Sequence, residues 1–326
     1  MSKYSFLNRN LFISRFDEYY SLKKPFIFIV DFQIENFFIA TVDELKEDDN
    51  ILFDFKGYSN ISKSNQNKIL KINPQPIPLK DYAISFNKVQ SHLSDGDSYL
   101  LNLTFPTKIE INATFEDIFY SSKADYKLKF YDNFVFFSPE RFVLIKDKKI
   151  FTHPMKGTKV YENDSSVTEL LNDEKEMAEH LTIVDLLRND LSMIADDVKV
   201  NRFRYVSYIK TVDKTIIQTS SEIEGTLKDG SVASHILQIL PAGSISGAPK
   251  RKTIEIIKNV EIDERGFYTG IAGVFDGDVI DTCVIIRYIE RKGDKLIYRS
   301  GGGITIYSDL QQEYQEIIDK VYVPCF

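Results

Sequence analysis

Stretches of Phe, Ile and Val separated by polar breaks predict several strands and one helix in the first hundred residues. Residues 26–42 are rich in these apolar types and carry a group of polar residues near their middle, which predicts two β-strands joined by a turn. Residues 51–57 predict a third strand that ends at a glycine. Residues 59–80 are polar and proline-containing, so we expect a connection there. A helix over 80–93 and a buried strand over 98–105 follow.

Two later segments predict helices that carry paired carboxylates. Between residues 174 and 195, apolar residues recur at the spacing of one helix face, and Glu176 and Glu179 share a neighbouring face. A second helix near residues 310–321 carries Glu313 and Glu316 in the same way. Carboxylate pairs on two helices would suit Mg²⁺, which protein carboxylates hold together with substrate oxygens and water. From the spacing alone, solvated surface pairs are the favoured alternative.

Glycine is concentrated in the second half of the chain, where 12 of the 15 glycines lie at or beyond Gly225. Glycine lets a backbone approach a ligand closely, although additional hairpin turns explain the asymmetry equally well. A glycine-containing loop over 240–250 precedes a predicted helix with Pro249 at its first position, and amides at such a start attract anions. The Ser246 hydroxyl could add a donor there. Three further glycines at 301–303 follow a predicted strand and expose N–H groups that suit a carboxylate.

One lysine lies between a proline and a glycine, directly after a predicted strand at 149–152. Lys156 in such a tight turn could act as a nucleophile or a base, although an ordinary solvated lysine is the common alternative. Glu140 precedes it by a distance that fits two strands of a hairpin. We therefore expect this carboxyl group and this amine to lie in one region.

Composition and charge exclude several classes of protein. The chain of 326 residues is 43% hydrophobic and 27% charged, as is ordinary for a globular protein. Its net charge is −7 and it has no long basic run, which excludes a nucleic-acid-binding surface. The absence of a long apolar run predicts no membrane span and no signal peptide. Two distant cysteines, Cys283 and Cys325, favour the reducing cytoplasm over a disulfide framework.

Eight segments between residues 138 and 320 resemble, in order, those of the chorismate-utilising family, which includes anthranilate, aminodeoxychorismate, isochorismate and salicylate synthases. The resemblance implies an α/β (α+β) sandwich of large antiparallel β-sheets flanked by helices, with the active site in a cleft. It also implies a catalytic region over 81–326 and a short β-rich region over 1–80 within the same globular unit. The matching segments are SPERF (138–142), PMKGT (154–158), AEHLTIVDLLRNDL (178–191), PAGSISGAPKRKTIEII (241–257), RGFYTGIAG (265–273), IIR (285–287), GGGI (301–304) and EYQEIIDK (313–320).

The resemblance also implies roles for the residues that match. Glu179 and Glu316 correspond to the principal Mg²⁺ ligands, with Glu176 and Glu313 in support. Glu140 corresponds to the general acid that protonates the departing C4 hydroxyl, a role for a carboxyl group whose pKa is raised by burial. The residues expected to bind the substrate are Tyr268, Arg287, Gly302, Gly303, Lys320 and Ser246.

Lys156 distinguishes the branches of this family. PMKGT is close to the PIKGT form of aminodeoxychorismate synthases, in which this lysine is thought to attack C2 of chorismate before ammonia enters at C4. Anthranilate synthases usually have PIAGT. Isochorismate and salicylate synthases use a lysine on another strand to activate water, and the corresponding residue here is Leu100. We therefore expect component I of aminodeoxychorismate synthase, which makes 4-amino-4-deoxychorismate for 4-aminobenzoate and folate synthesis.

Some positions depart from the family pattern. Gln218 stands where the family commonly has a histidine, and no glutamine amidotransferase motif is visible, so a separate glutaminase subunit is expected to supply ammonia. Anthranilate synthase component I is one alternative, and a non-catalytic chorismate-binding subunit is another. The combined presence of Glu140, Lys156 and Arg287 with the carboxylate pairs disfavours a scaffold, which would need none of them.

Overall fold

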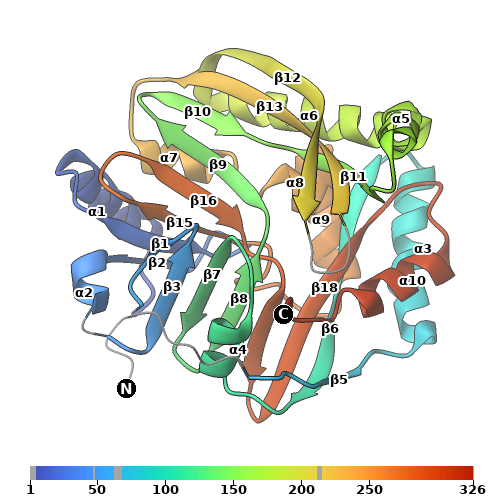
Figure 1. Ribbon diagram of the computed structural model, residues 1–326, viewed down its shortest axis with the longest axis horizontal. Coiled ribbons are helices and arrows are strands. Elements are labelled where there is room, and N and C mark those ends of the chain that lie inside the picture. The colour runs from blue at the N-terminus through green and yellow to red at the C-terminus, as the bar shows by residue number, and fades with distance from the viewer. Residues whose placement is uncertain (1–4, 47, 62–67, 211–214, 326) are drawn as a thin grey trace.

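Two antiparallel sheets of nine strands each form the centre of the protein, with helices packed around them (Figure 1). The computed structural model describes residues 5–46, 48–61, 68–210 and 215–325. The predicted sandwich of large antiparallel sheets with flanking helices is confirmed. Within the described ranges, no helix is long and apolar enough to cross a membrane.

The first sheet contains the most deeply buried strand of the N-terminal region. β1 lies between β2 and β15, and all five of its residues are buried. A strand covered on both faces is a continuous apolar run, which explains why residues 26–30 show no polar alternation. β12 (Ala195–Lys210) pairs with β13 beside the main path. The spatial order is β11 (Met155–Val160), β13 (Thr215–Leu227), β10 (Lys149–Thr152), β9 (Arg141–Lys146), β16 (Ile280–Val284), β15 (Ile271–Phe275), β1 (Phe26–Val30), β2 (Phe37–Thr41).

The second sheet contains the long pair β6 and β18, which are hydrogen-bonded from Leu101 to Ile109 of β6. β5 (Ile72–Gln75) pairs with the far end of β6, so strands from the first 80 residues join both sheets. The spatial order is β14 (Gly247–Ala248), β6 (Leu100–Ile111), β18 (Lys295–Ile304), β17 (Tyr288–Lys292), β8 (Phe134–Ser138), β7 (Tyr126–Phe130), β3 (Ile51–Phe55), β4 (Tyr58–Ser59).

Strand alternation divides the core into layers. Ile27 and Ile29 of β1 lie in an apolar cluster with Phe53 and Phe136 of the second sheet, so the two sheets pack face to face there. The intervening Phe28 lies in a larger cluster between the first sheet and the helices. This arrangement follows from the period of two, because successive side chains of a strand point to opposite faces.

Helices supply the remaining apolar surface of the larger cluster. α1, α3, α6, α7 and α9 all contribute buried residues to it, whereas α4 packs on the outer face of the second sheet. The helices are α1 (Arg9–Ser21), α2 (Val42–Lys46), α3 (Leu79–Ser94), α4 (Phe115–Ser121), α5 (Asp164–Asn172), α6 (Glu174–Ile194), α7 (Val232–Gln238), α8 (Gly243–Ser246), α9 (Lys250–Val260) and α10 (Leu310–Asp319).

Most predicted elements of the first hundred residues are confirmed, with shifts at their ends. β1, β2, β3 and α3 occupy the predicted segments, and β6 begins two residues later than expected and continues to Ile111. The expectation that residues 59–80 form only a connection is wrong, because β5 lies within them; residues 62–67 lie outside the described residues. Pro74 is tolerated there because, among the described strands, β5 pairs with β6 alone, so its missing N–H breaks no second ladder.

Candidate active site

A cavity of about 330 Å³ lies where β6, β11, β13 and β18 approach the loops around α8 and Tyr268. Several residues that the sequence singled out line it together, although they come from distant parts of the chain. Glu176, Glu179, Gly302 and Glu313 are near it but are not among its lining residues. The predicted residues that line it are Glu140, Lys156, Ser246, Tyr268, Arg287, Gly303, Glu316 and Lys320.

Glu140 faces this cavity between β8 and β9. Burial raises the pKa of its carboxyl group, and the positive charges of Lys156 and Arg287 oppose that rise only in part. The Ser244 hydroxyl donates a hydrogen bond to Glu140 Oε1 at 2.7 Å and also opposes it. A carboxyl group with a raised pKa keeps its proton more readily, which suits a general acid.

Lys156 lies on β11, the strand that follows the predicted hairpin of β9 and β10. Its Nζ is 3.2 Å from Glu179 Oε2 on α6, and its carbonyl accepts a hydrogen bond from the Thr219 hydroxyl. The next residue, Gly157, has φ +74°, and a Cβ there would lie 3.2 Å from Glu176 Oε2. Glycine at this position therefore lets α6 bring both of its carboxylates close to the lysine.

The second carboxylate pair lies against β18. A Cβ at Gly302 would be 3.2 Å from Glu313 Oε2 and 3.5 Å from Glu316 Oε1, so the carboxylates of α10 lie close to the bare backbone of this strand. Lys320, at the end of α10, is ion-paired with Glu316 and donates to the Gly301 carbonyl at 2.8 Å. The predicted pairing of carboxylates on one helix face is thus found on both α6 and α10.

The two carboxylate pairs offer the oxygen donors that a cation site needs, but they do not form a complete ligand set. Burial raises the pKa of Glu176 and of Glu313, and the neighbouring Glu179 and Glu316 raise them further. Such pairs favour a bound cation, and carboxylate oxygens are the donors that Mg²⁺ prefers. The donor chemistry therefore fits Mg²⁺, although no group of three His, Cys, Asp or Glu residues with metal-binding geometry occurs among the described residues.

Tyr268 and Arg287 meet at the other side of the cavity. Tyr268 is buried, and burial raises its pKa to about 12, so its phenol remains a hydrogen-bond donor at neutral pH. Arg287 follows β16 with a φ of +55°, a conformation in which a residue with a side chain is uncommon. The pair offers a guanidinium and a phenol to an anion, as the sequence predicts.

Two details of the glycine-rich segments differ from expectation. Gly301 to Gly303 are part of β18, in register with β6, and Gly301 and Gly303 line the cavity whereas the predicted Gly302 does not. The Ser246 hydroxyl is buried and donates to the Ala242 carbonyl at 2.9 Å within α8. It is Ser244, which the sequence reasoning did not select, that reaches the general-acid candidate, because the turn of α8 points its hydroxyl towards Glu140.

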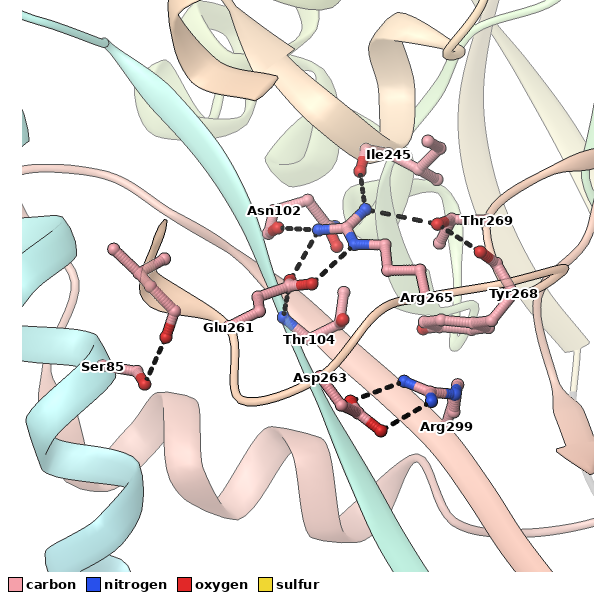
Figure 2. A network of polar contacts seen from close by, with 11 residues as sticks. Ser85, Asn102, Thr104, Ile245, Glu261, Asp263, Arg265, Tyr268, Thr269 and Arg299 are labelled. Carbon is pink, nitrogen blue, oxygen red and sulfur yellow. Dashed lines mark hydrogen bonds and ion pairs between the residues drawn. The ribbon is translucent and has the colours of Figure 1, made fainter. Parts of the chain in front are cut away.

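A buried arginine joins three walls of the cavity, and no role for it was predicted. Figure 2 shows the Arg265 guanidinium donating to the carbonyls of Asn102 at 2.6 Å and Ile245 at 2.9 Å. It also bonds Thr269 Oγ1 and pairs with Glu261 at 2.7 Å. Asn102, Ile245 and Thr269 all line the cavity. Two features of the sequence pointed to it: the four-residue spacing of Glu261 and Arg265, and the place of Arg265 at the start of the matching segment RGFYTGIAG (265–273).

Residues 19–324 match the family described as chorismate binding enzyme. The chain belongs to this chorismate-binding enzyme family. A PabA-like protein of Haemophilus influenzae, described as uncharacterised, is 46% identical to this enzyme over 316 residues, which are 96% of each chain. Aminodeoxychorismate synthase component 1 of Bacillus subtilis is 31% identical over 76% of this chain and 55% of its own. An anthranilate synthase component 1 of Haloarcula marismortui is 35% identical over 74% of this chain and 52% of its own.

Solved structures agree with this membership. The menaquinone-specific isochorismate synthase of Escherichia coli has the same fold, with a TM-score of 0.74 at 16% identity, covering 97% of this chain and 82% of that one. Anthranilate synthase component I of Streptococcus pneumoniae matches with a TM-score of 0.66 at 29% identity, covering 77% of this chain and 58% of that one. The protein is therefore an enzyme that uses chorismate.

Proposed function

We propose that this enzyme is component I of an aminodeoxychorismate synthase, which converts chorismate and ammonia into 4-amino-4-deoxychorismate. The observation that carries the proposal is Lys156, whose side chain lines the same cavity as the general-acid candidate Glu140. Leu100 also lines this cavity, at the position where water-activating relatives carry a lysine. A leucine there cannot deprotonate water, so hydration of chorismate is disfavoured as the reaction.

In the proposed reaction, the Lys156 amine attacks C2 of the chorismate ring and the double bonds shift. The C4–oxygen bond breaks, and Glu140 gives its proton to the departing hydroxyl, which leaves as water. Ammonia then forms a bond to C4, the double bonds shift back, and the C2–nitrogen bond to Lys156 breaks. The lysine is restored, and the amine at C4 loses a proton.

Mg²⁺ is proposed to be held by Glu179 and Glu316, with Glu176 and Glu313 in support. When bound, the ion supplies positive charge for the ring carboxylate of chorismate. Arg287 and Tyr268 are proposed to bind the second carboxylate, because guanidinium donors match a carboxylate geometrically. The Gly302 and Gly303 amides, Lys320 and Ser246 remain proposed contributors to substrate binding.

A glutamine amidotransferase subunit is the proposed source of ammonia, in keeping with the names of the component 1 relatives. Neither cysteine of this chain suits a glutaminase nucleophile. Cys283 is buried in β16, and burial raises the pKa of its thiol and also that of Cys325, which disfavours the reactive thiolate at both positions. Two free cysteines also fit the cytoplasmic location that we propose.

The test replaces the proposed nucleophile. Lys156→Ala should lower C4 amination by a factor on the order of 100 or more, because the two-step substitution is lost. The remaining activity should shift towards amination at C2, and elimination of pyruvate from that product would yield anthranilate. Product analysis with chorismate, Mg²⁺ and ammonium measures this, and mass spectrometry of the intact wild-type protein with chorismate seeks the covalent adduct.

Lys159→Ala is the matched control, because Lys159 lies on the same strand but pairs with Glu169 at the surface. It should retain wild-type rate and product. Anthranilate as the product of the wild-type chain would favour anthranilate synthase component I. Wild-type production of aminodeoxychorismate by Lys156→Ala would make the lysine a bystander and remove the main support for this function.

A further inference from the structure

Residues 321–325, here called the C-terminal strap, follow α10 and are hydrogen-bonded at two points, one on the second sheet and one just after α4. The Tyr298 hydroxyl of β18 donates to the Tyr322 carbonyl at 2.9 Å. The Lys123 N–H, just after α4, donates to the Pro324 carbonyl at 2.7 Å. Val321 is buried in the apolar cluster beneath the strap. The backbone of Tyr322 is therefore fixed on both sides.

This attachment brings one strap side chain against the proposed carboxylate-binding arginine. The Arg287 guanidinium lies over the Tyr322 ring, 5.1 Å from its centroid, and its Nη2 is 3.4 Å from the Tyr322 hydroxyl. A cation at this distance from an aromatic face is attracted by the ring quadrupole. The hydroxyl contact is long for a hydrogen bond, so the ring face makes the larger contribution.

We propose that Tyr322 is a positioning residue for Arg287, holding its guanidinium in the orientation that receives a substrate carboxylate. The inference rests on the proposed role of Arg287 and extends it to a residue outside the segments that resemble the family. Arg287 lies between β16 and β17, and the backbone of an arginine does not by itself fix where its long side chain points. The Tyr322 ring of the strap supplies that restraint.

The contact with Tyr322 and carboxylate binding are compatible on one guanidinium. The group has five N–H donors, and the only one that approaches Tyr322 is on Nη2, 3.4 Å from the hydroxyl. An arginine held in this way keeps most of its donors for a bidentate carboxylate. Restricting the side chain before the substrate arrives also reduces the ordering cost of binding, which raises affinity.

The experiment measures equilibrium binding of chorismate, by calorimetry with Mg²⁺ and without ammonia, to the full chain and three variants. Tyr322→Leu keeps an apolar side chain but lacks the ring and should weaken binding by roughly 2- to 30-fold. Tyr322→Phe keeps the ring and should bind like the wild type. Tyr307→Leu is the control, since Tyr307 is 91% exposed and is not among the cavity's lining residues. In turnover, Tyr322→Leu should raise KM and leave kcat nearly unchanged.

Unchanged or tighter binding by Tyr322→Leu would overturn the proposal, and so would equal losses in Tyr322→Leu and Tyr322→Phe. A double-mutant cycle with Arg287→Met tests whether Tyr322 acts through Arg287. Replacing Tyr322 should no longer change chorismate binding once Arg287 is absent. Undiminished binding by Arg287→Met alone would also overturn the proposal, because the guanidinium would then have no carboxylate to receive. These measurements do not depend on which product forms, so an error in the proposed amination at C4 would appear separately, in the product analysis.

Discussion

At the scale of single residues, the chemistry depends on contacts that set the proton affinity of Glu140. Burial raises the pKa of this carboxyl group, while the Ser244 hydrogen bond stabilises its ionised form and opposes the rise. A general acid must be protonated to act, so activity should fall as the pH rises through the pKa of Glu140. Ser244 therefore contributes to the pH range in which the enzyme works.

Ser244→Ala should move the alkaline limb of the profile of kcat/KM against pH to higher pH. The Ser244 hydroxyl stabilises the ionised form of Glu140. Without it the carboxylate is less stable, so Glu140 keeps its proton to higher pH. The rate below that limb should fall by roughly tenfold, as expected for a lost hydrogen bond to an ionisable group. The profile is measured with chorismate and a fixed concentration of total ammonium.

Ser244→Thr retains the hydroxyl and should keep the wild-type limb. Ammonium itself titrates equally in all samples, so the comparison between variants isolates the contribution of the enzyme. A limb that stays in place or moves to lower pH in Ser244→Ala would show that another group carries the proton.

At the scale of elements, the site is assembled by helices docked on glycine-containing strands. α6 and α10 each present two carboxylates, and the glycines at 157 and 302 lie within 3.2 Å of a carboxylate oxygen once a Cβ is added. A side chain at either position would crowd these carboxylates and shift them from the places that they occupy here. The helical spacing places two carboxylates on one face of each helix. The glycines on the neighbouring strands leave room for these carboxylates near the cavity.

Replacing Glu179 or Glu316 with Gln should abolish Mg²⁺-dependent turnover and leave the fold intact. Both side chains are partly exposed, so no core packing is lost, while the amide cannot supply the anionic oxygen that Mg²⁺ needs. Mg²⁺ titration of chorismate turnover measures the loss, and circular dichroism reports the fold. Glu174→Gln, at the exposed start of α6, is the control and should behave like the wild type. Activity that persists in EDTA would refute the metal assignment.

At the scale of the whole molecule, the cleft is held by long-range polar links. Arg265 and Glu261 are almost completely buried and connect β6, the α8 loop and the turn at Thr269 (Figure 2). A buried arginine with five satisfied contacts fixes backbone positions that apolar packing alone would allow to shift. The buried Arg265–Glu261 pair thus stabilises the backbone that lines the cavity.

The purified chain should aminate chorismate with ammonium alone and should use glutamine only when a glutaminase subunit is added. The basis is the absence of a suitable nucleophile, since Cys283 is buried within β16. The measurement compares turnover with ammonium, with glutamine, and with glutamine plus the partner. A partner whose nucleophile has been chemically blocked is the control and should restore nothing. Glutamine-driven turnover by the single chain would contradict the prediction.

Short-range spacing in the sequence determined the elements and the residue types of the site. The apolar face of α6 and the two carboxylate pairs follow from the helical period, and β1, β2 and β3 follow from apolar runs. The ordered family segments pointed to Glu140, Lys156 and Arg287 because each lies inside one of the short matching segments. The helix α1 was missed, since its apolar face is narrow and mixed with aromatic and charged residues.

Which side chains of the site come into contact depends on the tertiary structure. Ser244 reaches Glu140 across 104 positions of the chain, Lys156 pairs with Glu179 across 23, and Arg287 contacts Tyr322 across 35. No local period encodes such contacts. They depend on the order of strands in the two sheets and on how closely α6, α8 and α10 approach them. Spacing along the chain fixes what a side chain can do, and long-range packing fixes the partner with which it does it.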